Sequence, residues 1–473
     1  MDRRTLILAC CCTGQFLGVL DVSIVNVALD PIRADLGFST AGLQWVVNAY
    51  TLACAGFLLL GGRAADLFGR REVFAGGLAL FGLASLVGGL AQDPATLVAA
   101  RAGQGLGGAI VAPTSLSILA TTFEEGPQRN RAFGLWGTLG GLGGVSGAIV
   151  GGILTDALSW RWVLLLNAPV ALGVALVSLR AIPPLGRRPG AARRFDLLGA
   201  VTITAGLVLL TYGIVASHRD GWGAALPPIA AGVALLGLFG LIEARLAAAP
   251  LVPLRIFRSR ALSGANAVGF CLGAAAFSMW FFVSLYVQRV LGFSPLDAGL
   301  TFVPMSLAII ACTQVASRLA ARVGPGRVLA AGMALLGAGM LLFSRIDADG
   351  SWAADVLAPS LLCAAGIGFS FVSTTITANT GVAGEDSGLA SGLVNTAFQI
   401  GGSIGLALLA TIASSHTAAV ADEVSRAAAL TAGFERAFAA GGCFALAGSA
   451  VALALLVRRT GRAPARRASP LAR

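Results

Sequence analysis

The residues best placed to do chemistry are a carboxylic acid and an arginine inside apolar segments. Asp21 is the one acid in the apolar run from Leu6 to Leu29, and Arg101 lies within the run 95–120. About 20 apolar residues suffice to cross a bilayer as a helix, where a charged side chain costs roughly 2.5–3.5 kcal/mol. We therefore expect Arg101 to face the protein interior near Asp21, the only acid well inside the helices of the first half.

A carboxylate beside a guanidinium in such a place is suited to proton transfer. Burial disfavours the ionised form of a carboxylate, whereas a neighbouring cation favours it. These opposing influences suit a site that loads and releases a proton as its surroundings alternate. A simpler alternative is that Arg101 only donates hydrogen bonds that tie its helix to the first one.

The composition is typical of a membrane protein with many spans. Of the 473 residues, 56% are hydrophobic and 12% are charged, whereas soluble domains carry about 25% charged residues. The eight cysteines lie in apolar segments without metal-binding spacing, and the two histidines lie in predicted loops. The chain has no lysine and therefore no phosphate-binding GxxxxGK[ST] loop. The sequence thus predicts no metal and no cofactor.

Apolar runs separated by short loops predict an all-α integral membrane protein with fourteen transmembrane helices, because a helix satisfies its own backbone in lipid. With the N-terminus inside, 25 of the 33 arginines fall on the cytoplasmic side and seven outside, which predicts that both termini are cytoplasmic. This placement explains the net charge of +11 without nucleic-acid binding. The predicted spans are 6–29, 43–61, 73–91, 95–120, 131–154, 162–182, 195–216, 225–246, 261–286, 297–320, 327–345, 354–378, 388–412 and 435–457.

An internal repeat relates the two halves of the chain. Four glycines of the fifth span recur at one constant offset in the thirteenth span, so spans 1–6 correspond to spans 9–14 and two spans are inserted between them. Two six-helix repeats around a midplane site are typical of transporters. The predicted parts are an N-terminal six-helix bundle (1–182), a linker with the two inserted helices (183–260), a C-terminal six-helix bundle (261–457) and a basic cytoplasmic tail (458–473).

The loop between the second and third spans reads GRAADLFGRR (Gly62–Arg71). Its glycines permit a tight turn between closely packed helices. The loop resembles a signature of the major facilitator superfamily, and the chain resembles that superfamily's fourteen-span drug:proton antiporters over nearly its whole length. The resemblance implies a latch for the alternating-access change, although Leu67 stands where an arginine is common. The latch residues would be Gly62, Asp66, Gly69, Arg70 and Arg71.

Two further stretches carry the resemblance into the membrane. LVAARAGQGLGGA, with Arg101, Gln104 and Gly105, is similar to the motif whose arginine is associated with proton coupling in the superfamily. LDVSIVNVAL (Leu20–Leu29) is similar to the first-span signature of the antiporters. The resemblance implies that Asp21 and Arg101 couple proton movement to transport, and Asn26 would offer Asp21 a nearby polar contact.

Asp30 stands where the family usually has proline, and we expect it to be a solvated charge at the membrane edge. Asp196 and Glu243 lie near the cytoplasmic ends of the inserted helices, where we expect them to bind loop arginines.

The fifth span reads GTLGGLGGVSGAIVGG (Gly137–Gly152) and resembles the antiporter motif of exporters in the superfamily. Its glycines, Gly147 and Gly151 among them, would allow close helix packing. Ala148 replaces the usual proline, which weakens the implied direction of transport. The following stretch SWRWVLLLNAP, with Arg161 and Asn167, is among the most subfamily-like in the chain.

Aromatic and amide side chains are the candidate substrate contacts. The second half has no acid in mid-span, which argues against a dicationic substrate. Aromatic rings and amides suit an amphiphilic compound that is uncharged or weakly cationic. Each of the candidates could equally be a packing or lipid-facing residue. They are Asn48, Trp136, Asn266, Trp280, Phe281, Gln314, Asn395 and Gln399.

These features favour a secondary active transporter, a proton-coupled antiporter that exports lipophilic drug- or antibiotic-like compounds. The alternative is a transporter of the same fold dedicated to one metabolite, lipid or siderophore. No cluster typical of an intramembrane enzyme is present, so we expect no enzymatic activity. We expect a monomer in the bacterial plasma membrane whose partners are protons, a small lipophilic substrate and the lipid bilayer, and not nucleic acid.

Overall fold

The computed structural model describes residues 2–124, 126–184, 196–219, 221–247, 250–380 and 387–457. These residues form helices, turns and loops, with no β-strand among them. Fourteen helices are long and apolar enough to cross a membrane, which confirms the predicted fold class and number of spans. The expectations for the arginines at 187, 188, 193 and 194 and for the basic tail lie outside the described residues.

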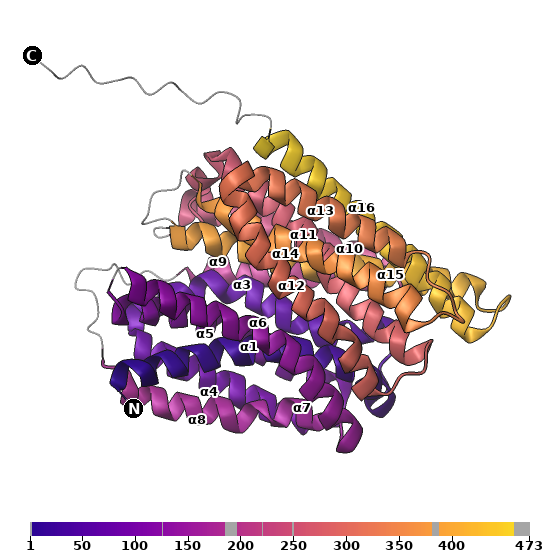
Figure 1. Cartoon of the computed structure of the whole chain (residues 1–473), viewed down its shortest axis with the longest axis horizontal. Helices are drawn as coiled ribbons and strands as arrows, with labels where there is room; N and C mark the ends of the chain where they lie inside the picture. Colours follow the sequence, from indigo (N-terminus) through magenta and orange to yellow (C-terminus); the bar gives the residue numbers. More distant parts are fainter. Residues whose placement is uncertain are drawn as a thin grey trace, which may run out of the picture.

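The first bundle (indigo to magenta in Figure 1) contains the first six spans. The sixth span is interrupted at Leu166, which separates two short helices. α1 packs against α6, and α5 packs against α3 and α4. The helices are α1 (Arg3–Leu36), α2 (Thr40–Leu43), α3 (Trp45–Phe68), α4 (Arg70–Gly89), α5 (Pro94–Thr122), α6 (Pro127–Ala157), α7 (Arg161–Leu165) and α8 (Asn167–Ala181).

The second bundle (pink to yellow in Figure 1) contains the last six spans. The two inserted helices, α9 and α10, pack on each other, and α9 also packs on α3 and α15. The inserted elements are α9 (Leu197–Arg219), α10 (Gly221–Leu241), η1 (Ile242–Leu246) and η2 (Leu254–Arg258). The second bundle comprises α11 (Arg260–Arg289), α12 (Pro295–Val323), α13 (Pro325–Phe343), η3 (Trp352–Leu357), α14 (Ala358–Asn379), α15 (Ser387–Val420), α16 (Arg426–Ala452) and η5 (Leu453–Val457).

Glycines bring the helices of the first bundle into close contact around Asp21. A Cβ atom on Gly147 would lie 2.8 Å from the Leu20 carbonyl oxygen, so α6 can approach α1 closely only because position 147 has no side chain. A Cβ atom on Gly105 would overlap the Tyr50 carbonyl, which fixes α5 against α3. Small residues permit such close packing of membrane helices. The glycines of both motifs therefore position the helices that carry the buried acid and arginine.

The two bundles are joined at one end of the molecule, the end where α1 finishes. Ser284 Oγ donates to the Asn26 carbonyl at 2.6 Å, and Gln288 Nε2 donates to the Val27 carbonyl at 3.2 Å. Asp30 on α1 pairs with Arg289 on α11, with Arg289 Nε 2.5 Å from Asp30 Oδ1. The expectation that Asp30 is a solvated charge was therefore wrong. α1 runs on to Leu36, so Asp30 lies on the helix and faces the other bundle.

At the opposite end the bundles enclose a cavity of about 1240 Å³. Its walls come from the late turns of α3 and α5, the early turns of α6 and α15, and the segment around η2. This is the end at which α1 begins, so the structure is closed on one side of the membrane and hollow on the side of the N-terminus. We refer to this space as the entry cavity.

Candidate functional site

Asp21 is the centre of a buried polar network within the first bundle. It is fully buried and its carboxylate accepts three hydrogen bonds. Oδ2 accepts from Arg101 Nη1 at 2.5 Å, while Oδ1 accepts from Gln104 Nε2 and Asn167 Nδ2, each at 2.9 Å. The donors come from α5 and α8, so three helices meet at one carboxylate. Each of these partners is a hydrogen-bond donor from a neighbouring helix.

Arg101 is held by groups on two other helices, α1 and α3, as well as by a neighbour on its own. Besides Asp21, its guanidinium donates to the Val46 carbonyl at 2.9 Å and to Gln104 Oε1 at 2.8 Å. Gln104 in turn donates to Ser85 Oγ at 2.8 Å. The guanidinium carbon lies 4.7 Å from the centre of the Tyr50 ring, a cation–π contact. The buried charge thus has the partners that an intramembrane arginine requires.

Tyr50 separates this network from a second cavity between the bundles. This central cavity has a volume of about 310 Å³, and Tyr50 both lines it and contacts Arg101. Asp21 and Arg101 are not among the lining residues. Leu58, Ala112 and Asn395 line both the central and the entry cavity, so the two spaces adjoin. Tyr50 therefore lies beside both the central cavity and the charged pair.

The central cavity is aromatic on the side of the second bundle. Phe277 and Phe371 each pack against Phe398, with ring centres 5.4 and 5.7 Å apart. Its polar side chains are the amides of Gln15, Asn395 and Gln399, together with the Tyr50 hydroxyl. Apolar walls with a few polar groups are typical of sites for small amphiphilic molecules.

Of the candidate substrate contacts, three line the cavities between the bundles. Asn395 lines both cavities and Gln399 lines the central one. Trp136 lines the entry cavity and donates from Nε1 to Ser115 Oγ at 2.9 Å.

The other candidates lie elsewhere, for reasons that packing explains. Phe281 and Trp280 pack in the core of the second bundle, against Phe282 and Phe302 respectively. Asn266 Nδ2 donates to the Leu262 carbonyl on its own helix. Gln314 is exposed on α12 and lines neither cavity.

Asn48 is fully buried, and within the described part of the chain both polar atoms of its side chain lack a hydrogen-bond partner. Asn26 does not contact Asp21 as expected: its amide donates to the Val22 carbonyl at 2.7 Å, because a separation of five residues turns it away from Asp21 around the helix.

The motif residues outside the network have structural positions in the first bundle. Gly151 packs against Ile24 of α1, as Gly147 does against Leu20. Arg161 contacts Asp35 at the end of α1, with Nη1 2.5 Å from Oδ2, and its guanidinium lies over the Trp160 ring. Asn167, expected only as a motif residue, is a direct partner of Asp21.

The latch residues lie at the turn between α3 and α4, beside the entry cavity. Gly62 lines that cavity, and Gly69 has a φ of 103°, a conformation that favours glycine. Arg71 pairs with the neighbouring Glu72, with 2.7 Å between Nη2 and Oε1, and Arg70 begins α4. The side chain of Asp66 lies outside the described residues, so the latch stays a prediction.

Sequence reasoning missed Tyr50, Ser85 and the three phenylalanines of the central cavity. Tyr50 is one of only three tyrosines in the chain, and it lies in an apolar span near Asn48. That rarity was a signal that could have been used. The phenylalanines gave none, because nothing in the sequence distinguishes them from other core residues among the 24.

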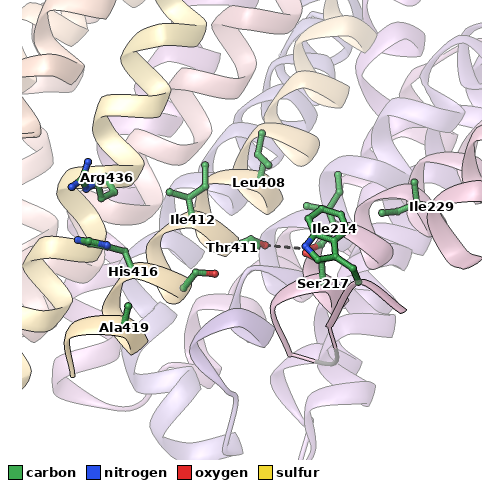
Figure 2. A pocket seen from close by; sticks show the side chains of 11 residues that line it. Ile214, Ser217, Ile229, Leu408, Thr411, Ile412, His416, Ala419 and Arg436 are labelled. Carbon is green, nitrogen blue, oxygen red and sulfur yellow. Dashed lines mark hydrogen bonds between the residues drawn. The ribbon is translucent and has the colours of Figure 1, made fainter. Parts of the chain in front are cut away.

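A third cavity, of about 540 Å³, lies between the inserted helices and the second bundle (Figure 2). Its walls are mostly apolar, with Ile214, Ile229 and Ile412 among them, and His416 and Arg436 lie at one side. Thr411 donates to the Ile214 carbonyl at 3.3 Å and joins α15 to α9 there. None of the residues predicted to act in transport lines it.

Comparisons with known proteins agree with this architecture. The chain is 44% identical to the cephamycin export protein CmcT of Amycolatopsis lactamdurans, over 88% of this chain and 86% of that protein. It is 41% identical to the puromycin resistance protein pur8 of Streptomyces alboniger, over 86% and 81%. A bacterial homologue of the human lysosomal transporter Spinster, in an inward-facing and unoccupied conformation, shares the fold with a TM-score of 0.71 at 14% identity, covering 96% of this chain and 97% of that one.

The family comparison covers most of the chain and includes every residue of the Asp21 network. The family model described as Major Facilitator Superfamily matches residues 11–406, which run from α1 into α15. The chain therefore belongs to the major facilitator superfamily, and it is a multi-pass membrane protein of that family.

Proposed function

We propose that this protein is a proton-coupled antiporter that exports antibiotic-like or other lipophilic compounds. The observation that carries the proposal is the buried Asp21–Arg101 pair, which contacts the wall of the central cavity through Tyr50. The export and resistance functions in the names of its relatives support the substrate class. Transport is driven by the proton gradient and needs no cofactor.

In this mechanism Asp21 alternates between an ionised and a protonated state. In the structure described here the carboxylate accepts hydrogen bonds from three donors, one of them the Arg101 guanidinium. Protonation removes the charge that holds Arg101, so the guanidinium must rely on its other partners: the Val46 carbonyl, Gln104 and the Tyr50 ring. A shift of that ring changes the wall of the central cavity. Substrate binding and proton binding are thereby linked through one side chain.

The direction of transport follows from orientation. The excess of arginines in the loops on the side of the N-terminus favours a cytoplasmic location for that side, with both termini inside. The entry cavity then faces the cytoplasm, where an exporter collects its substrate. The protein acts as a monomer in the bacterial plasma membrane, and its partners are protons and a small amphiphilic substrate.

Transport in proteoliposomes tests the proposal. Purified protein is reconstituted, and an imposed pH gradient drives uptake into inside-out vesicles of a cephalosporin-type β-lactam or puromycin. We expect the wild-type protein to accumulate substrate only while the gradient persists. Asp21→Asn should lose gradient-driven accumulation but keep substrate exchange without a gradient, because the amide preserves an oxygen acceptor for Gln104 and Asn167. Gradient-driven transport at the wild-type rate by Asp21→Asn would contradict the role of Asp21.

A further inference from the structure

Two carboxylates outside the Asp21 network meet beside the entry cavity. Asp196 precedes α9 and Glu243 lies in η1 after α10, so they come from opposite ends of the inserted helix pair. Their carboxyl groups lie close enough to interact with each other. Both residues line the entry cavity, and Glu243 is only 5% exposed. The loop arginines at 187, 188, 193 and 194, which we expected as their partners, lie outside the described residues, and the two carboxyl groups interact with each other.

The hydrogen bonds of the two side chains leave one oxygen of each without a donor. Asp196 Oδ1 accepts from the Gly199 amide at 2.7 Å, and Glu243 Oε2 accepts from the Val252 amide at 3.0 Å. Asp196 Oδ2 and Glu243 Oε1 are buried and have no hydrogen-bond partner among the described residues. Buried polar atoms are nearly always satisfied, so two orphaned acceptors on adjacent acids require an explanation.

A proton supplies what both oxygens lack. Two adjacent carboxylates cannot readily both be ionised away from water, and such pairs hold one proton between them. Cations could relieve the repulsion instead, and the charged groups of the neighbouring walls are Arg63 on α3 and Arg255 in η2. In the described part of the chain neither arginine forms an ion pair with either acid. The α15 residues that line the cavity carry no charge.

We propose that Asp196 and Glu243 form a second proton-binding site, in which one proton is shared between Asp196 Oδ2 and Glu243 Oε1 in the wall of the entry cavity. The site joins three segments, because Glu243 also holds the backbone at Val252, which leads through η2 into α11. Loss of the proton leaves two adjacent anions and loosens this junction between the inserted helices and the second bundle. The role of this site in transport rests on the proposed antiport function, whereas the shared proton itself does not.

Infrared difference spectroscopy of the full-length protein tests for the proton directly. Spectra are recorded between pH 6 and pH 9 in the Asp21→Asn background, which removes the other buried acid of the proposed mechanism and makes the test independent of transport. We expect the C=O stretch of a protonated carboxylic acid to remain in this background. Either Asp196→Asn or Glu243→Gln should then remove the whole band, because the introduced amide donates to the remaining carboxylate and keeps it ionised.

The control is Glu435→Gln, which removes a partly buried acid of α16. It should leave the band intact, and Asp196→Asn, Glu243→Gln and Glu435→Gln should each leave the thermal unfolding of the Asp21→Asn parent unchanged. Two separately protonated acids would each lose about half of the band in the single variants, which would overturn the shared proton. A parent spectrum without the band, or a band that survives both substitutions, would overturn the site. Failure of gradient-driven transport by the wild-type protein would instead count against the proposed function and leave this site unaffected.

Discussion

Two aspartates of α1 each pair with an arginine of another helix. One pair lies within the first bundle, whereas the other joins the two bundles. Asp21 and Arg101 both belong to the first bundle, and their side chains are 0% and 2% exposed. Asp30 and Arg289 belong to different bundles, and their side chains are 26% and 7% exposed. Both pairs have an N–O distance of 2.5 Å.

The difference matters because alternating access moves one bundle against the other. A pair inside one bundle keeps its partners during that movement, so it can respond to a proton without being pulled apart. A pair between the bundles must break when the closed end opens. We therefore interpret the inner pair as the proton-responsive site and the outer pair as a contact that stabilises the conformation described here.

The largest effect is expected when the inner pair is broken from the arginine side. Arg101→Ala leaves Asp21 as a buried anion without its cation, a loss that typically costs about 3–5 kcal/mol. We expect a marked fall in the thermal unfolding midpoint and no gradient-driven transport. Arg161→Ala is the control, because its pair with Asp35 has side chains 32% and 45% exposed and such pairs contribute about 0–1 kcal/mol. Equal stability of the two variants would refute the expectation that the buried pair contributes more to stability than the exposed pair.

A smaller effect is expected from displacing α1 without touching a charge. Gly147→Ala places a Cβ atom 2.8 Å from both the Leu20 carbonyl oxygen and Ser23 Cβ, and overpacking of this kind costs about 1–3 kcal/mol. Gly134→Ala on the same helix meets nothing within 4 Å and should not destabilise the protein. The measurement is the unfolding midpoint together with the transport rate. A Gly147→Ala protein that transports normally would show that the inner pair tolerates movement of α1.

The contact between the inner pair and the central cavity can be tested at Tyr50. Tyr50→Leu removes the aromatic face over Arg101, a contact worth about 0.5–2 kcal/mol, and should weaken the coupling of substrate binding to pH. Tyr50→Phe keeps the ring and should behave like the wild-type protein. Substrate affinity measured at several pH values reports the coupling. If Tyr50→Leu retains the full pH dependence, the ring does not transmit the proton state.

The smallest effect on stability is expected at the outer pair. Asp30→Asn should change the unfolding midpoint little, since partly exposed pairs contribute about 0–1 kcal/mol, but it should favour opening of the closed end. Labelling of a cysteine introduced at Ser284 in that end should become faster, with the native cysteines replaced by alanine. Asp35→Asn is the matched control, because Asp35 is on the same helix but pairs within the first bundle. Equal labelling of both variants would show that the outer pair does not hold the bundles together.

Much of the architecture could be predicted because the bilayer imposes strong rules on sequence. Apolar runs of membrane length predicted the fourteen spans, and the cost of a charge in lipid predicted that Arg101 would lie near Asp21. Substrate contacts were predicted poorly. Phe281 and Phe277 are one helical turn apart on α11, yet only Phe277 lines the central cavity, and the sequence does not distinguish them.

The sequence by itself determined the class of fold, the existence of a buried acid and arginine, and the glycines that let their helices approach. Only the tertiary structure decided which groups complete the network, because Asn167, Tyr50 and Ser85 come from three helices whose relative rotation depends on packing. It also decided that Asp30 joins the bundles, and that Asp196 and Glu243 meet each other. These contacts join residues far apart in the chain, and no local pattern of spacing records them.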